Sequence, residues 1–203
     1  INPNLAQPLP VIIPWDDAYT NNHDLDRPTL TTDKARHVGD PIAVVVAEST
    51  YAAADALEAI QVNYKPLSAV VDPEKALDSA ASIIHESAGT NLAFQWNGSG
   101  GDVDAAFADA EKVVEVRIHN QRLIHSAMEP RAVTATYDAD SDSYTMWTTT
   151  QVPHAIKGHI AGILGVDEEK MRVIAPEVGG GFGAKSNIHA EEVLAHYLAK
   201  QLG

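Results

Sequence analysis

Residues 171 to 202 read MRVIAPEVGGGFGAKSNIHAEEVLAHYLAKQL and contain a strand pattern, a glycine-rich stretch and a helix pattern in succession. The segment opens with an apolar, β-branched run that predicts a strand over 171–175. It closes with an apolar stripe at helical spacing, which predicts a helix with Ser186 or Asn187 as its N-cap. Between the two lies a glycine-rich loop. Glycine runs cost backbone entropy, so a stable domain keeps one for a purpose.

The residues before this segment predict a hairpin and a second helix. Strand-like runs occupy 112–119, 131–137 and 143–150, and the turn DADSDS joins the last two as a hairpin. Pro153 and the apolar positions after it predict a helix over 154–164.

The first half of the chain predicts a β-α-β unit and a break. Apolar runs at 42–47 and 60–64 read as strands that flank a helix over 51–59, capped by Ser49 or Thr50. A right-handed crossover would make these strands parallel. The tract NGSGG at 97–101 places a domain boundary between 72 and 105, and a short helix is expected just after it, over 102–110. The first ~30 residues read as an extended arm.

Composition limits the classes of partner. The net charge of −14 argues against a nucleic-acid backbone or an anionic membrane surface. The chain has no cysteine, so it holds no disulfide, thiolate metal site or iron–sulfur cluster. This is compatible with the cytosol, and we expect a cytoplasmic protein. No apolar run reaches the roughly 18 residues of a membrane span. The chain lacks an initiator Met, and we expect a fragment or a processed subunit.

The glycine loop partly fits two nucleotide-binding templates. Gly179, Gly181 and Ala184 follow the dinucleotide pattern G-x-G-x-x-G/A, but no acidic residue follows about 20 positions on. Lys185 and Ser186 fit the end of a P-loop, although Ala184 stands where that template needs glycine. Both patterns share backbone N–H groups ahead of a helix, which bind anions. A nucleotide- or phosphate-binding protein that uses the Gly179–Lys185 loop stays open, as does a structural turn.

Other candidate side chains are few. His189 and His196 lie about 10 Å apart along the expected helix, too far to share a metal. Gln151 follows a strand and precedes a helix, where α/β folds bind ligands, and its carboxamide both donates and accepts. Glu129 and Arg131 form a charged pair before a strand, either a surface salt bridge or something buried.

Four segments together resemble one family. HVGDPIAVVVAESTYAAADALEAIQVNYKPLSAVVD, HNQRLIHSAMEPRAVTATYD, TTTQVPHAIKGHIAGILGV and VGGGFGAKSNIHAEEVLAHYLA follow the order seen in molybdenum hydroxylases. This is the family of xanthine dehydrogenase, aldehyde oxidase and the carbon monoxide dehydrogenase large chain, and the resemblance covers residues 35 to 203. It implies an α+β fold: the C-terminal half of an α/β hammerhead domain over 1–75, a linker over 76–105, and the N-terminal part of a mixed α/β molybdenum-cofactor-binding domain over 106–203.

The resemblance also implies a cofactor site. The family binds molybdenum through a molybdopterin, in bacterial members usually the cytosine dinucleotide form, and the pterin sulfurs hold the metal. Gln151 matches the family glutamine that hydrogen-bonds an oxo ligand. Gly180, Gly181, Phe182 and Gly183 match the loop beside the metal, with backbone contacts from Phe182 and Gly183. No residue of this chain is expected to ligate the metal directly.

The implied activity is an oxidoreductase that hydroxylates an aldehyde, a heterocycle or a CO-like small substrate, with water as the oxygen source. The base glutamate is expected beyond residue 203, so no catalytic residue is identified in this chain. Implied partners are the rest of the large subunit and iron–sulfur and FAD domains or subunits, in a dimer of heterotrimers. The isolated chain is then expected to be inactive. A non-catalytic fragment that keeps only the fold is the further alternative. Purine-oxidising members carry glutamate where this chain has Ser186, which argues against a purine substrate.

Overall fold

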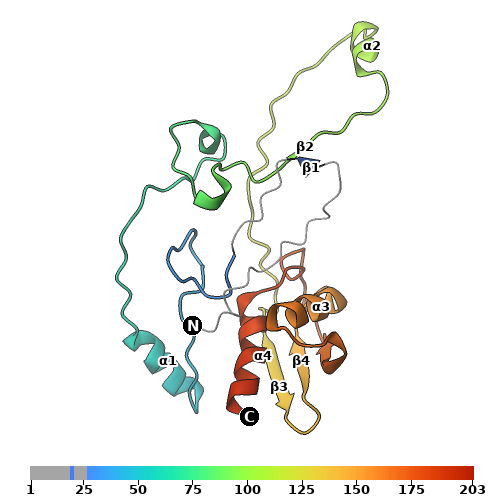
Figure 1. Cartoon of the computed structure of the whole chain (residues 1–203). Helices are drawn as coiled ribbons and strands as arrows, with labels where there is room; N and C mark the ends of the chain where they lie inside the picture. Colours follow the sequence, from blue (N-terminus) through green and yellow to red (C-terminus); the bar gives the residue numbers. More distant parts are fainter. Residues whose placement is uncertain (1–18, 21–26) are drawn as a thin grey trace.

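A computed structural model describes residues 19–20 and 27–203 of the chain. Its C-terminal third is a packed α/β unit, and long extended segments and short helices rise away from it (Figure 1). Between the packed unit and the distant helix α2 (Val103–Ala108), β1 (Tyr19–Thr20) pairs antiparallel with β2 (Gln95–Trp96) (Figure 1). Most of the extended arm expected at the N-terminus lies outside the described residues.

The packed unit is built on a three-stranded sheet in the order β3-β4-β5. The strands β3 (Val133–Asp138) and β4 (Ser143–Thr148) form an antiparallel hairpin, as the DADSDS turn predicts. The strand β5 (Met171–Ile174) lies parallel to β4 on its other side. A parallel neighbour requires a crossover, and the chain between β4 and β5 provides it as a helix. The sheet thus confirms the strands predicted in this part of the chain.

The crossover helix α3 (Pro153–Leu164) begins with proline in its first turn and ends at Gly165 in the left-handed conformation. The short 3-10 helix η4 (Glu168–Lys170) then leads into β5. The last helix, α4 (Ala190–Leu202), starts later than the sequence predicted. Its N-cap is His189 rather than Ser186 or Asn187, because the backbone N–H of Ser186 still closes a turn of the loop by donating to Gly183 O at 3.2 Å.

The hydrophobic core lies between the sheet and the two long helices. Helix α4 packs against β3, α3 packs against β5, and the two helices contact each other. Strand β4 buries alternate side chains, as expected for a strand with one covered face. The core consists of buried apolar residues from the sheet, both helices and the glycine loop: Tyr144, Met146, Ile156, Ile160, Ala161, Ile163, Met171, Ile188, Ala190, Val193 and Leu194.

An ionic cluster joins the hairpin to the last helix. Asp142, at the hairpin turn, accepts hydrogen bonds from the Lys170 ammonium and from the Tyr137 hydroxyl at 2.8 Å. The Lys200 ammonium of α4 lies 3.6 Å from the same carboxylate. These contacts, the Lys170 hydrogen bond foremost, lower the pKa of Asp142 to about 2. Asp142 therefore stays ionised well into the acidic range and ties β3 and β4 to their neighbours.

In the N-terminal half the predicted helices form and the predicted strands do not. Helix α1 (Thr50–Ala59) is capped by Ser49, whose hydroxyl accepts the Ala52 N–H at 3.1 Å, and α2 (Val103–Ala108) confirms the second short helix. The β-α-β expectation is wrong here, because 42–47 and 60–64 are not strands, and neither is 112–119.

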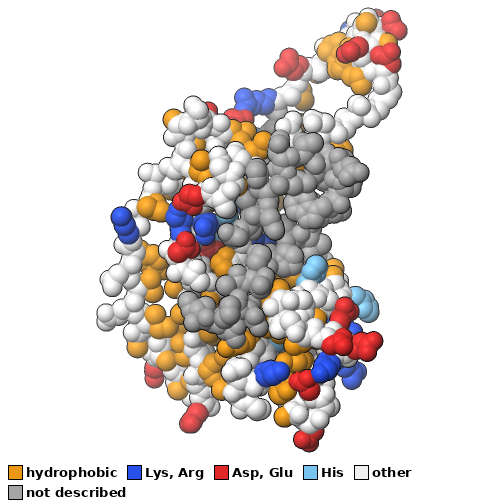
Figure 2. Space-filling model, in the orientation of Figure 1, with side chains coloured by type: hydrophobic (Ala, Val, Ile, Leu, Met, Phe, Trp, Pro, Cys, Tyr) orange, Lys and Arg blue, Asp and Glu red, His pale blue; other side chains and the backbone are white. Residues whose placement is uncertain are grey.

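The missing strands have a physical reason. A strand forms only when a neighbouring strand satisfies its backbone groups, and these segments have no such neighbour within the described part of the chain. Their apolar side chains stay largely exposed, as at Val44, Val62 and Val114. Hydrophobic side chains are accordingly spread over the face that carries α1 (Figure 2).

No described helix has both the length and the hydrophobicity that crossing a bilayer requires.

Truncation of Met146 tests where stability resides. Its side chain is 0% exposed at the centre of β4, so Met146→Ala should lower the free energy of unfolding by about 2–5 kcal/mol. Met128, which is 96% exposed, is the matched control, and Met128→Ala should change it by less than about 0.5 kcal/mol. Urea denaturation of the purified protein measures both. Equal effects would show that the sheet is not the stabilising core.

Candidate functional site

The glycine loop follows β5 and folds back over the ends of other segments. Four of its residues have positive φ: Gly179 at 61°, Gly180 at 89°, Phe182 at 51° and Gly183 at 86°. Glycine adopts this conformation freely, whereas a phenylalanine at positive φ is uncommon and strained. Such strain persists where the surrounding structure enforces it, often at functional sites. Phe182 as a whole is 69% exposed, so packing in the core does not explain its backbone conformation.

Two of the glycines are required by close approach. A Cβ at Gly179 would lie 2.1 Å from Cβ of Glu129, and a Cβ at Gly181 would lie 2.2 Å from Oε1 of Gln151. Real Cβ atoms do not come so near other heavy atoms. The loop therefore rests directly on the 129 segment and on Gln151, and no larger residue can replace either glycine without displacing them.

Gln151 is brought onto the loop by three hydrogen bonds. Its Oε1 accepts the backbone N–H of Gly183 at 3.1 Å and that of Lys185 at 3.2 Å. Its own backbone N–H donates to Lys185 O at 2.9 Å. The carboxamide oxygen is thus fully used. Its Nε2 group has no acceptor among the described residues, so it can donate to a ligand.

Further donors lie beside this amide. The N–H groups of Ala184 and Ser186 close turns within the loop, on Gly181 O and Gly183 O. The N–H groups of Gly180, Gly181 and Phe182 have no acceptor within the described part of the chain. Consecutive N–H groups in such a backbone form a concavity that favours negatively charged oxygen. The sequence patterns predicted an anion-binding loop, and these unpartnered donors have the chemistry that such a loop needs.

Lys185 does not extend this concavity. Its side chain is 3% exposed, and its ammonium donates to Glu129 O at 2.8 Å and to Val178 O. A P-loop lysine must instead reach the phosphates with its charge. Because the ammonium of Lys185 is already bound to two carbonyls, the phosphate-binding alternative loses its cationic group.

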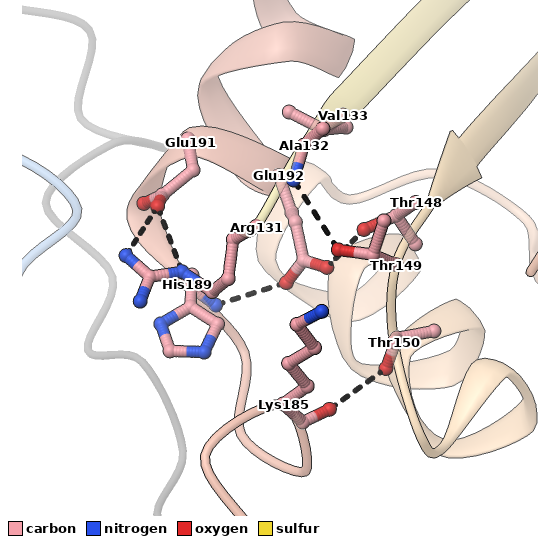
Figure 3. Close-up of a pocket in the computed structure, with 10 residues that line it drawn as sticks. All are labelled: Arg131, Ala132, Val133, Thr148, Thr149, Thr150, Lys185, His189, Glu191 and Glu192. Atoms are coloured by element: carbon pink, nitrogen blue, oxygen red, sulfur yellow. Dashed lines mark hydrogen bonds and ion pairs between the residues drawn. The ribbon is translucent and has the colours of Figure 1, made fainter. Parts of the chain in front are cut away.

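A small polar pocket lies behind the loop, between the ends of β3 and β4 and the start of α4 (Figure 3). Thr148 donates its hydroxyl to Oε1 of Glu192 at 2.7 Å. Thr149 accepts the Ala132 N–H at 3.2 Å, and Thr150 donates its hydroxyl to Lys185 O at 3.2 Å. Three consecutive threonines therefore attach the end of β4 to the last helix, to the residue just before β3 and to the loop.

Glu192 is the buried acid of this pocket. Its side chain is 3% exposed, and its Oε2 accepts the His189 N–H at 3.0 Å, which completes a capping box at the start of α4. Burial raises the pKa of Glu192, against the opposing hydrogen bonds from His189 and Thr148. The sequence did not reveal this box, because the usual signature has serine or threonine at the N-cap and here it has histidine.

The two histidines of the last helix have structural contacts. His189 Nε2 lies 3.0 Å from Ala184 O, and His196 Nδ1 lies 3.0 Å from Glu192 O. Burial lowers the pKa of His196, which favours its neutral form. Within 19–20 and 27–203, no three His, Cys, Asp or Glu side chains converge as a metal would require.

The charged pair before β3 takes a form that the sequence left open. Arg131 binds Glu191 of α4 rather than Glu129, with Nη2 and Oε1 2.7 Å apart on the surface. The Glu129 side chain instead lies against Gly179, where an added Cβ would be 2.2 Å from its Oε2. The backbone N–H of Glu129 donates to Gly179 O at 3.3 Å. Glu129 therefore contacts the glycine loop, whereas Arg131 contacts the last helix.

Glu192→Gln tests the buried acid by its pH dependence. The raised native pKa means that the folded state binds the proton more tightly than the unfolded state, whose pKa is near 4.5. Stability should therefore fall as the pH rises from 4.5 toward neutrality, and Glu192→Gln should lack this decline. Urea denaturation between pH 4.5 and neutrality measures the free energy of unfolding of both proteins.

Glu191→Gln is the matched control. Burial alone would raise the pKa of Glu191. A backbone hydrogen bond and the nearby Arg131 outweigh burial, so the pKa of Glu191 is lowered. Its removal should therefore leave the decline above pH 4.5 intact. Parallel pH profiles for wild type and Glu192→Gln would contradict a raised pKa at Glu192.

Comparison with known families finds two matches along the chain. Residues 84–203 match the molybdopterin cofactor-binding domain, and residues 12–68 match the a/b hammerhead domain of aldehyde oxidase and xanthine dehydrogenase. The first match contains the sheet, α3, the glycine loop and α4.

Individual relatives agree with these matches. The chain is 37% identical over 175 residues to the nicotine 6-hydroxylase large subunit of Paenarthrobacter nicotinovorans, covering 86% of this chain and 21% of that protein. It is 32% identical over 197 residues to the carbon monoxide dehydrogenase large chain of Hydrogenophaga pseudoflava, covering 87% and 24%. The chain thus spans about a fifth to a quarter of these relatives.

Solved structures show the same similarity in space. The CO dehydrogenase from Oligotropha carboxidovorans superposes with a TM-score of 0.77 at 33% identity, over 87% of this chain and 24% of that one. Quinoline 2-oxidoreductase from Pseudomonas putida 86 gives 0.72 at 33% identity, over 87% and 22%.

Proposed function

The chain belongs to the molybdenum hydroxylase family, and we propose that it is part of a large subunit whose molybdenum-cofactor site is lined by Gln151 and the glycine loop. The observation that carries the proposal is the juxtaposition of the free Gln151 Nε2 group with the unpartnered N–H groups of Gly180, Gly181 and Phe182. These donors come from segments far apart in the chain, and folding alone brings them together.

The residues present fit such a group. The unpartnered donors suit an oxygen ligand, and the approach of Gly181 to Gln151 leaves no space that a side chain could fill. The cofactor, when bound, supplies the redox chemistry. The protein's task here is to hold the ligand oxygen by hydrogen bonds from fixed amides, which stabilise developing charge without reorganising.

We propose a separate role for each donor. The expected backbone contacts came from Phe182 and Gly183, but the Gly183 N–H is bound to Gln151 Oε1. In our proposal Gly183 therefore orients the carboxamide, while Phe182 N–H and Gln151 Nε2 donate to the ligand. The strained φ of Phe182 would aim its N–H, and its exposed ring would border the substrate.

The wider activity follows the family. We propose hydroxylation of an aldehyde, a heterocycle or a CO-like substrate with water as oxygen source, and Ser186 after the loop lysine argues against a purine. The base glutamate, the iron–sulfur and FAD groups and the rest of the large subunit would lie outside these 203 residues. The cofactor would be the cytosine dinucleotide form of the molybdenum-pterin cofactor. The complete complex would be a dimer of heterotrimers. We propose the same domain bounds as in the sequence analysis: a hammerhead-like domain over 1–75, a linker over 76–105 and the molybdenum-cofactor-binding domain over 106–203.

Metal and pterin analysis of the purified intact complex tests the proposal directly. Molybdenum and pterin should both be present, in the ratio of one metal per large subunit that a single site requires. Active complex without either of them would refute it. Saturable ATP or NAD binding that Lys185→Ala abolishes would instead favour the nucleotide-binding alternative.

Two variants of Gln151 separate its donor from its acceptor. Gln151→Glu keeps an oxygen for the Gly183 and Lys185 N–H groups but replaces the Nε2 donor. Loss of one hydrogen bond to a charged ligand oxygen, about 1–3 kcal/mol, corresponds to a fall in turnover of roughly 5–150-fold. We expect this fall in the intact complex, with the aldehyde, pyridine or CO that the wild type oxidises, and little change in melting temperature.

Gln151→Ala loses both functions, so it should reduce turnover as much and also loosen the loop. Gln201→Ala, an exposed glutamine near the end of α4, is the neutral control. A melting temperature that falls in step with turnover in Gln151→Glu would show that Gln151 is a structural residue.

A further inference from the structure

Lys185 makes contacts that no glycine-loop pattern explains. Its side chain is 3% exposed, and its ammonium donates to carbonyls of two different segments, Glu129 O at 2.8 Å and Val178 O. Burying an ammonium is costly unless hydrogen bonds compensate it. Here the compensation comes from backbone carbonyls, so the side chain fastens the start of the loop, at Val178, to the segment just before β3.

The backbone of Lys185 completes the attachment on the other side. Its N–H donates to Gln151 Oε1 at 3.2 Å, and its carbonyl accepts the Gln151 N–H at 2.9 Å and the Thr150 hydroxyl at 3.2 Å. Figure 3 shows the contact with Thr150. One residue thus joins the strand end at Thr150 and Gln151, the start of the loop, and the 129 segment.

These contacts determine which end of the Gln151 amide is available. With Oε1 held by Gly183 N–H and Lys185 N–H, the carboxamide cannot flip without losing two acceptor contacts and opposing donor to donor. Its Nε2 group is then left for a ligand. The ammonium of the same residue is bonded to the start of the loop and to the 129 segment.

We propose that Lys185 is a positioning residue for Gln151: its buried ammonium clamps the glycine loop so that the Gln151 carboxamide presents Nε2 to the ligand. The proposal rests on the proposed function for the identity of that ligand, an oxygen bound to the molybdenum cofactor. The clamp itself is a property of this chain alone. In this proposal Lys185 binds neither cofactor nor substrate and acts on turnover through Gln151.

Hydrogen–deuterium exchange of the intact complex tests the clamp without any substrate. Lys185→Met keeps an unbranched side chain that ends at Cε, lacks only the ammonium, and leaves two partly buried carbonyls without a donor. The peptide that contains Gly183 and residue 185 should exchange at least about fivefold faster, as local opening becomes cheaper. A peptide of β4 should exchange as in wild type. Lys157→Met, on the surface of α3, is the matched control and should change neither peptide.

A double-mutant cycle tests whether Lys185 acts through Gln151. Lys185→Met and Gln151→Glu should each reduce turnover of the intact complex, and the double variant should be no slower than the slower single one. Fold-losses that multiply would mean independent roles and would overturn the proposal, as would unchanged exchange of the loop peptide. If the complex with Lys185→Met does not assemble, Lys185→Gln replaces it. The glutamine amide can still donate a hydrogen bond to a carbonyl, so this variant gives the same test at smaller amplitude.

The exchange and metal measurements keep the two proposals apart. A complex without molybdenum contradicts the proposed function, while faster loop exchange in Lys185→Met still demonstrates the clamp. A complex that holds molybdenum but shows unchanged exchange contradicts the clamp and leaves the proposed function standing.

Discussion

The Lys185 ammonium lies inside the protein, 2.8 Å from the carbonyl of Glu129 and bonded also to that of Val178. A cation in this position needs both carbonyls, and both are present only when the loop lies on the 129 segment. That closure brings Gly183 N–H and Lys185 N–H to Gln151 Oε1. The exposed chemistry of the site, donors without acceptors, therefore depends on a buried contact that takes no part in binding.

The sheet and its polar edge give this contact a rigid support. At the end of β4, the Thr148 hydroxyl donates a hydrogen bond to Glu192 of the last helix. Just beyond it, the Thr150 hydroxyl donates to the carbonyl of Lys185. The apolar core beneath them fixes strand and helices relative to one another. Loop geometry is then set by hydrogen bonds to elements that cannot move independently. Donors held in this way need no reorganisation when charge appears beside them, which is the property that a redox site uses.

The features predicted from sequence are those with local causes. The hairpin follows from alternation and the DADSDS turn, and α3 follows from Pro153 and its apolar spacing. Wrong predictions have non-local causes. The segments 42–47, 60–64 and 112–119 have strand-like composition, but a strand needs a partner that pattern cannot supply. The cap of α4 was misplaced because the turns of the loop continue through Ser186.

At the site, the residue types could be read from the chain alone: glycines that permit positive φ, a glutamine at a strand end, and the ordered segments that resemble the molybdenum hydroxylases. Their contacts follow only from the way the chain folds. Lys185 resembles a phosphate-binding lysine in the pattern and is a buried clamp in the fold. Glu129 and Arg131 are neighbours in the chain but belong to different contacts. The reason is physical: a hydrogen bond depends on which groups meet in space, and spacing along a chain describes only those that meet within one helix, strand or turn.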